Sequence, residues 1–236
     1  MRILLFGGTG KLGREIFKLS KDVEAPLHSE CDVIEKEKVC QIIKKVNPDV
    51  IIHAAALVGT RECEDNRELA WKVNVEGTQN IVKAARNLKK RLIFISSAAV
   101  FDGSKGNYKE IDIPTPSFYY AVTKIAAEQT VRTLENYAIV RLDFFPLSGL
   151  KYKKVFTDHY ASKITVNEAA EKILKVAKSD FQGIINIGRE RETLFNILKR
   201  YYSEIEPIKI SESSLPSFPK DLSLDLSLWK KFFENS

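Results

Sequence analysis

Short apolar runs alternate along the chain with segments that have helical spacing. The runs are rich in Val, Ile and Leu and occupy residues 2–6, 49–55, 91–96, 137–142 and 183–188. Runs this short that are apolar at nearly every position indicate strands buried on both faces, as in a parallel sheet. Between them, apolar residues recur three and four positions apart, which predicts helices. We therefore expect a doubly wound α/β fold of the Rossmann type.

Composition narrows the class of protein. A chain of 236 residues with 44% apolar residues can bury one large core. No apolar run reaches the roughly 20 residues of a membrane span, and the first residues have the pattern of a strand leading into glycines, unlike a secretion signal. The net charge of +6 is spread along the chain and not gathered on one tail. We expect neither a membrane nor a nucleic acid as partner.

The cysteines and histidines give no metal-binding pattern. Cys31, Cys40 and Cys63 contain no Cys-x-x-Cys pair. An odd and sparse set of this kind indicates a reducing, cytoplasmic location and predicts small buried apolar residues, with no metal. His53 closes an apolar run and is expected to pack there.

A glycine-rich loop follows the first predicted strand and opens the first predicted helix. Gly7, Gly10 and Gly13 are spaced as G-x-x-G-x-x-G. Glycines allow a tight turn and a close approach of the backbone to a pyrophosphate, which the helix N-terminus then attracts. The position of this pattern in an α/β chain predicts dinucleotide binding. We expect residues 1–142 to form the dinucleotide-binding domain and residues 143–236 to form a small substrate-side region packed on it.

The choice of dinucleotide depends on the end of the second strand, which we predict over residues 23–27. An acidic residue there would hold a ribose hydroxyl of NAD. His28 and Ser29 follow instead, and Lys11 and Arg14 supply positive charge nearby. This favours NADP(H), and NAD(H) remains open.

Three side chains suited to carbonyl chemistry follow later strands. Ser97 comes directly after the run 91–96, at the carboxyl end of a strand, where α/β sheets bind ligands. Tyr120 and Lys124 are one helical turn apart on the same face. The phenol has an ordinary pKa near 10, and an ammonium close by favours its ionised form. A hydroxyl, a phenol and an ammonium in these places predict proton transfer to or from a substrate oxygen.

Several motifs along the chain form a recognisable set. They are GGTGKLG (7–13), CDV (31–33), PDVIIHAAA (48–56), VNVEGT (73–78), ISSAAVFDG (95–103), YKE (108–110), YAVTK (120–124) and PKDLSLD (219–225). Together they resemble the extended short-chain dehydrogenase/reductase superfamily and, within it, the dTDP-4-dehydrorhamnose reductase family. The resemblance runs from Met1 to Asp225 and is densest before residue 142.

This resemblance implies roles for individual residues. Ser97 would polarise the substrate carbonyl, Tyr120 would act as general acid, Lys124 would also bind the nicotinamide ribose, and Asn74 would support a proton relay. Implied cofactor contacts are Gly7, Thr9, Gly10, Lys11, Leu12 and Gly13 in the loop, Asp32 and Val33 at the adenine, Ala54, Ala55 and Ala56 along the dinucleotide, and Tyr120 and Lys124. Two alternatives stay open: Asn74 caps a helical irregularity, and Asp32 is the N-cap of the following helix.

The chain departs from the family pattern on the substrate side. Ala98-Ala99 is more typical of sugar epimerases of the superfamily. Asp143 stands where the family tends to have a serine, within an Arg-Thr-Ser-Trp sequence, and Lys163-Ile164 replaces an expected Pro-Thr. The stretch between Arg141 and Asp158 is also shorter than usual, which implies a reduced substrate region.

The leading hypothesis is an NADPH-dependent reductase of a 4-keto deoxysugar nucleotide, acting in dTDP-rhamnose biosynthesis. An epimerase or dehydratase of the same superfamily is an alternative. So is a non-catalytic NADP-binding regulatory subunit, because the regulatory subunit of methionine adenosyltransferase resembles the same reductases and a fold does not ensure turnover. The expected partner is a nucleotide sugar, and a homodimer through helices flanking the sheet fits by analogy.

Overall fold

A six-stranded parallel sheet forms the centre of the molecule in the computed structural model, which describes residues 1–150, 153–213 and 218–234. Its strands are, in spatial order, β2 (Val23–Glu24), β1 (Ile3–Phe6), β3 (Val50–His53), β4 (Arg91–Ile95), β5 (Tyr137–Arg141) and β10 (Gly183–Asn186). All neighbouring strands run parallel. The five predicted strands and the doubly wound fold are confirmed.

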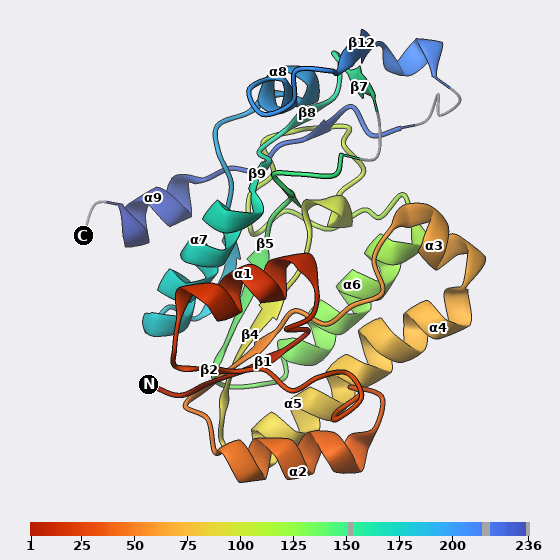
Figure 1. Cartoon of the computed structure of the whole chain (residues 1–236). Coiled ribbons are helices and arrows are strands. Elements are labelled where there is room, and N and C mark those ends of the chain that lie inside the picture. Colours follow the sequence, from red (N-terminus) through yellow and green to blue (C-terminus); the bar gives the residue numbers. More distant parts are fainter. Residues whose placement is uncertain (151–152, 214–217, 235–236) are drawn as a thin grey trace.

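Helices cover both faces of this sheet (Figure 1). One face packs against α1 (Lys11–Leu19), α7 (Val166–Lys178) and α9 (Ser227–Phe233). The other packs against α2 (Lys36–Val46), α5 (Gly77–Asn87) and α6 (Tyr119–Val131). Strand residues point alternately into the two cores: Ile3 and Leu5 face the first, Leu4 and Phe6 the second. This double burial explains why the strands are apolar throughout.

Two local features differ from the sequence expectation. The second strand covers only Val23–Glu24 and not residues 23–27, because Pro26 has no N–H for a ladder bond. The helical spacing between the runs 49–55 and 91–96 does not form one helix but α4 (Arg67–Trp71), a π-helical turn η1 (Lys72–Glu76) and α5, with α3 (Thr60–Asp65) before them. A π-turn of this kind is rare and is often found at functional sites.

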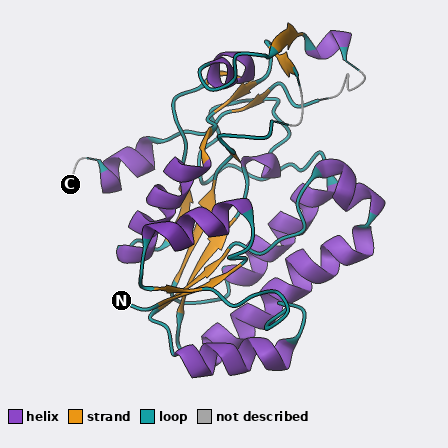
Figure 2. Cartoon of the chain, viewed as in Figure 1, coloured by secondary structure: helices purple, strands orange, loops and turns teal. Residues whose placement is uncertain are grey.

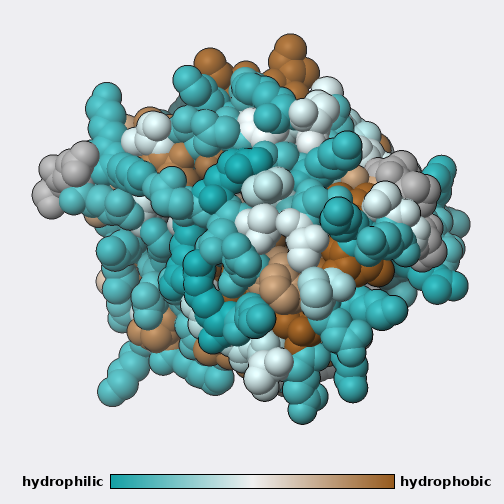
Figure 3. Space-filling view, turned by 90° about the horizontal axis from the view of Figure 1, so that it is seen from above, coloured by the Kyte–Doolittle hydropathy of each residue, from teal (hydrophilic) through white to brown (hydrophobic). Residues whose placement is uncertain are grey.

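Smaller sheets lie above the large one in Figure 1, and Figure 2 shows them joined mainly by loops. Two of them have two strands: β6 (Phe144–Phe145) with β9 (Ile164–Thr165), and β7 (Lys154–Phe156) with β12 (Glu206–Ile208). The third has three strands, with β8 (Tyr160–Ala161) between β11 (Glu192–Thr193) and β13 (Asp221–Leu222). The remaining helices are α8 (Leu194–Lys199) and the 3-10 turns η2 (Ala98–Val100) and η3 (Ile210–Glu212). Seen from this side, the surface is mostly hydrophilic with recessed apolar patches (Figure 3).

The segment after β5 is short. Between Arg141 and Asp158 the described residues hold only β6 and β7, and no helix. The prediction of a reduced segment extends over residues 151–152, which lie outside the described part of the chain.

Candidate active site

A pocket of about 310 Å³ opens at the carboxyl ends of β1 and β3. The strand order reverses here, since β2 lies on one side of β1 and β3 on the other, and such switch points bind ligands in open α/β sheets. The predicted cofactor residues in its lining are Gly7, Thr9, Gly10, Asp32, Val33, Ala54, Ala55 and Ala56. Of the remaining predicted contacts, Lys11, Leu12 and Gly13 lie just behind the loop in the first turn of α1.

The glycine loop has room only for backbone. Gly7 has a φ of +91°, and a Cβ there would lie 2.5 Å from the backbone nitrogen of Ala55. A Cβ on Gly13 would lie 2.1 Å from the carbonyl oxygen of Gly7. Gly10 is the N-cap of α1, and no described side chain caps this end. The first N–H groups of the helix, from Lys11 onward, therefore remain available to an anion.

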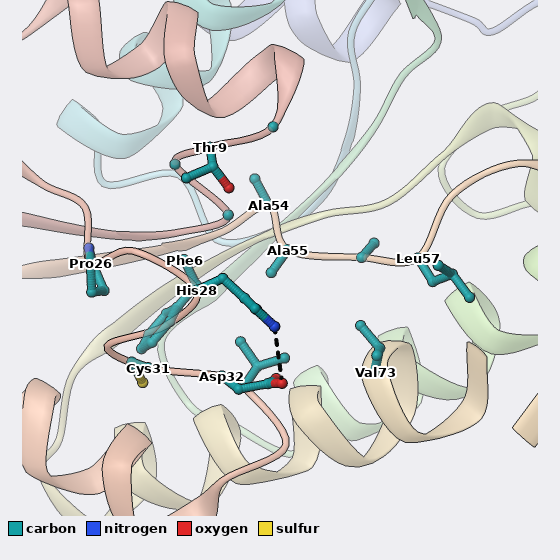
Figure 4. A pocket seen from close by; sticks show the side chains of 15 residues that line it. Phe6, Thr9, Pro26, His28, Cys31, Asp32, Ala54, Ala55, Leu57 and Val73 are labelled. Atoms are coloured by element: carbon teal, nitrogen blue, oxygen red, sulfur yellow. Dashed lines mark ion pairs between the residues drawn. The ribbon is translucent and has the colours of Figure 1, made fainter. Parts of the chain in front are cut away.

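The far end of the pocket carries its ionisable groups. His28 Nε2 lies 3.3 Å from Asp32 Oδ2, and the two side chains point toward each other (Figure 4). Asp32 Oδ1 accepts a hydrogen bond of 3.1 Å from the N–H of Ile34. The N-cap of α2 is Glu35, so the alternative that Asp32 caps this helix is wrong.

The sequence prediction missed part of the pocket lining. The additional residues are Phe6, Gly8, Pro26, His28, Cys31, Leu57 and Val73. Phe6 ends β1 and Val73 lies in the π-helical turn, and the others lie in the loops that follow β1, β2 and β3. The rule that ligands bind beyond the carboxyl ends of parallel strands would have identified these loops.

The reacting end lies where β4 and α6 meet. Ser97 follows β4, and its Oγ accepts a hydrogen bond of 3.1 Å from the N–H of Ala99. Tyr120 lies in the first turn of α6, and a hydrogen bond joins its side chain to that of Ser97. Burial raises the pKa of Tyr120, with the nearby Cys63 and Asp143 adding to the rise and the Ser97 hydrogen bond opposing it.

Lys124 lies one turn further along α6 and is almost fully buried. Its ammonium lies 4.0 Å from the centre of the Phe94 ring. Burial lowers the pKa of Lys124 to about 7, with the negative charge of Glu128 opposing the shift. We expected the lysine to lower the pKa of Tyr120; in the protein alone, burial of the phenol dominates and raises it.

Asn74 lies in the π-helical turn and is 1% exposed. Its Oδ1 accepts from the Leu57 N–H at 2.7 Å, and its Nδ2 donates to the Leu57 carbonyl at 3.0 Å and to Thr123 Oγ1 at 3.0 Å. The side chain thus ties the loop after β3 to α6. Its predicted part in a proton relay remains a prediction.

A buried ion pair supports the reacting end from behind. Arg141, at the end of β5, donates to Glu128 of α6 at 2.7 Å and 3.0 Å, and both side chains are 2% exposed or less. Ser96 donates a further hydrogen bond to the Glu128 carboxylate. The sequence prediction did not identify this pair, whose members are 13 residues apart.

His53 packs as predicted and is 1% exposed. Its ring contacts Phe6 and Phe94, and its Nε2 is 2.9 Å from Thr78 Oγ1. Burial, together with the positive charge of Lys124, lowers the pKa of His53 to about 3. The ring is therefore neutral at physiological pH.

The described residues contain neither a metal-binding cluster nor a helix that could span a membrane. No group of three or more His, Cys, Asp and Glu side chains is arranged to hold a metal ion. No helix among them is both long enough and apolar enough to span a bilayer.

The fold and the pocket's place at the switch point are those of the extended short-chain dehydrogenase/reductase superfamily. Residues 1–162 match the model of the RmlD substrate binding domain family, which is more than half of the chain. The chain belongs to this family.

Curated relatives match less than two thirds of the chain. A dTDP-4-dehydrorhamnose reductase from Aggregatibacter actinomycetemcomitans is 37% identical over 145 residues, covering 59% of this chain and 49% of the relative. Methionine adenosyltransferase 2 subunit beta from Bos taurus is 34% identical over 146 residues, covering 57% of this chain and 43% of the relative. The chain spans about half the length of the curated relatives it matches.

Solved structures match over nearly the whole chain. A hypothetical dTDP-4-dehydrorhamnose reductase from Sulfolobus tokodaii has a TM-score of 0.87 at 32% identity, covering 99% of this chain and 95% of that one. A dTDP-4-dehydrorhamnose reductase from Bacillus anthracis in complex with NADP has a TM-score of 0.89 at 22% identity, covering 98% and 92%, and shares the fold.

Proposed function

We propose that this protein is an NADPH-dependent reductase of a 4-keto deoxysugar nucleotide. The observation that carries the proposal is the hydrogen-bonded pair of Ser97 and Tyr120, with Lys124 buried one turn away, at the same edge of the sheet as the glycine loop. The similarity to dTDP-4-dehydrorhamnose reductases supports a sugar nucleotide as substrate.

The residues of the pocket fit a dinucleotide. Gly7 and Gly13 leave no room for side chains where the backbone would meet the pyrophosphate. Ala54, Ala55 and Ala56 line the pocket with small side chains, and Asp32 and Val33, which are expected to meet the adenine, line it as well. Glu24, the last residue of β2, pairs with Arg2 at 3.7 Å and is not part of the lining, which favours NADP(H) over NAD(H). The NADP bound to the Bacillus anthracis reductase supports the same choice.

The side chains at the reacting end can hold and protonate a carbonyl oxygen. A bound nicotinamide cofactor supplies the hydride that reduces the carbonyl carbon. Ser97 donates a hydrogen bond to the oxygen, and Tyr120 transfers its phenolic proton to the same oxygen, so that an alcohol forms. The raised pKa of Tyr120 keeps the phenol protonated at neutral pH, as a general acid requires. The ammonium of Lys124 stabilises the phenolate that remains.

Substitution of the acid tests this assignment. The variant Tyr120→Phe should lower kcat about 10²- to 10⁴-fold, the usual contribution of a positioned general acid, with dTDP-4-dehydro-6-deoxy-L-mannose and NADPH as reactants. Its affinity for NADPH, measured by cofactor fluorescence, should change little. Tyr119→Phe is the matched control, since Tyr119 precedes the acid and lies under Arg67, 4.9 Å away. Equal turnover in both variants would refute the role of Tyr120.

The similarity to methionine adenosyltransferase 2 subunit beta favours a second candidate, a non-catalytic dinucleotide-binding subunit. This alternative predicts that NADPH binds to the wild-type protein but is not oxidised by any keto sugar nucleotide. It also predicts a stable complex with a separate catalytic protein. Measured turnover that depends on Tyr120 would exclude it.

A further inference from the structure

Asp143 and Lys163, two positions that depart from the family pattern, lie side by side in the structure. Strand β6 pairs in parallel with β9, and the N–H of Ile164 donates to the carbonyl of Asp143 at 3.1 Å. This pairing brings the side chain of Lys163 beside Asp143, and its Nζ lies 3.0 Å from Asp143 Oδ2. The substitutions at 143 and 163 therefore complement each other as an ion pair.

The pair lies at the reacting end of the site. The carbonyl of Leu142 accepts a hydrogen bond of 3.0 Å from the N–H of Ala98, which sets Asp143 alongside the turn that carries Ser97. Its carboxylate is close enough to Tyr120 to contribute to the raised pKa of the phenol. The pair therefore lies near the place where the carbonyl oxygen would be held.

Asp143 and Lys163 both have side-chain groups that can form further hydrogen bonds. The side chains of Asp143 and Lys163 are 29% and 20% exposed. Among the described residues, Asp143 Oδ1 and the remaining N–H groups of Lys163 have no hydrogen-bond partner apart from this contact. The buried pair of Glu128 and Arg141 differs, because it is 1–2% exposed and bonded on both carboxylate oxygens. The Asp143–Lys163 pair is thus fixed in place but open to a ligand.

We propose that Asp143 and Lys163 bind the hydroxyl next to the reacting carbonyl and so select substrates that carry it, an inference that rests on the proposed function. The carboxylate accepts the hydrogen of this hydroxyl, and the ammonium donates to its oxygen. Because the two charges balance, the pair suits a neutral sugar ring better than a phosphate group.

A site built to bond a hydroxyl discriminates against an analogue that lacks it, since its polar groups are then left unpaired. With one charged acceptor and partial exposure, we expect about 10- to 100-fold weaker binding of the deoxy analogue.

Calorimetric titration of the NADP-loaded protein tests the pair. The ligands are dTDP-rhamnose and its 3-deoxy analogue, and the proteins are the wild type, Asp143→Leu, Lys163→Met and the double variant. The double variant removes both charges, so neither is left without its partner. It therefore keeps the test valid if a single variant folds poorly. Lys18→Met is the control, because Lys18 forms an ion pair with Glu15 at 2.7 Å on the outer surface of α1.

The wild type and the control should prefer dTDP-rhamnose about 10- to 100-fold, and this preference should vanish in the double variant while NADP affinity is unchanged. A preference that survives in the double variant would overturn the inference but leave the reductase proposal standing. Failure of the wild type to bind dTDP-rhamnose at all would overturn both.

Discussion

Around the dinucleotide pocket the chain contributes backbone and small side chains, whereas at the reacting end it contributes buried polar side chains. The pocket is shaped by positions such as Gly7 and Gly13, where any side chain would clash with neighbouring backbone. The reacting end depends on Lys124, Glu128 and other ionisable groups that must be neutralised inside the protein.

This difference has consequences for how each end tolerates change. Shape at the pocket is set by backbone that packs in direct contact, both within the glycine loop and between this loop and the loop after β3, so a single added methyl group would clash. Charge at the reacting end is set by partners on other strands and helices, so the loss of one partner leaves another charge buried and unpaired. The following substitutions probe the two ends separately.

The largest loss of stability is expected behind the reacting end. Arg141→Met leaves the Glu128 carboxylate buried without its cation and should lower the free energy of unfolding by about 3–5 kcal/mol. Chemical denaturation measures the change. Arg91→Met is the matched control, because the buried Arg91 guanidinium donates to backbone carbonyls, including Phe181 at 2.6 Å, instead of a carboxylate. A loss at Arg141 no larger than at Arg91 would contradict the argument.

A smaller effect is expected at the pocket. Gly13→Ala brings a Cβ to 2.1 Å from the Gly7 carbonyl oxygen, so the loop must move. Overpacking of this kind costs about 1–3 kcal/mol, and NADPH should bind about 10- to 100-fold more weakly in a fluorescence titration. Gly188→Ala creates a similar clash, 2.5 Å from the Ser162 carbonyl, far along the chain from the loop. Its NADPH affinity should stay at the wild-type value, and an equal loss there would mean that general destabilisation explains both.

The smallest effect, taken per pH unit, is a dependence of stability on pH. The unfolded chain keeps the Lys124 proton up to pH 10.5, whereas the folded protein releases it near pH 7. Between these values the unfolded state binds more protons, so stability rises with pH, by at most about 1.4 kcal/mol per pH unit. The difference in unfolding free energy between the wild type and Lys124→Met isolates this contribution. It should increase from pH 7 to pH 9, and a flat difference would show that the lysine stays charged when buried.

The same contrast explains what the sequence could predict. The strands, the fold and the glycine loop follow from local patterns, because each depends on the burial or backbone geometry of neighbouring residues. The pairing of Glu128 with Arg141 and of Asp143 with Lys163 depends on how β5, α6 and β9 come together, and no local spacing reports it. The raised pKa of Tyr120 was missed for the same reason, since burial of the phenol is a property of the assembled site.

Helix α1, which follows the glycine loop, packs against a much later part of the chain. The apolar side of α1 packs against α7, where Asn167 also donates to Glu15 at 3.2 Å. The family match ends at residue 162, before both α7 and β10. A fragment cut at that point would leave β5, with Ile139 and Val140, as an uncovered sheet edge open to pairing with other chains. The end of the family match is thus not a folding boundary, and the last third of the chain completes the fold of the part that the family model covers.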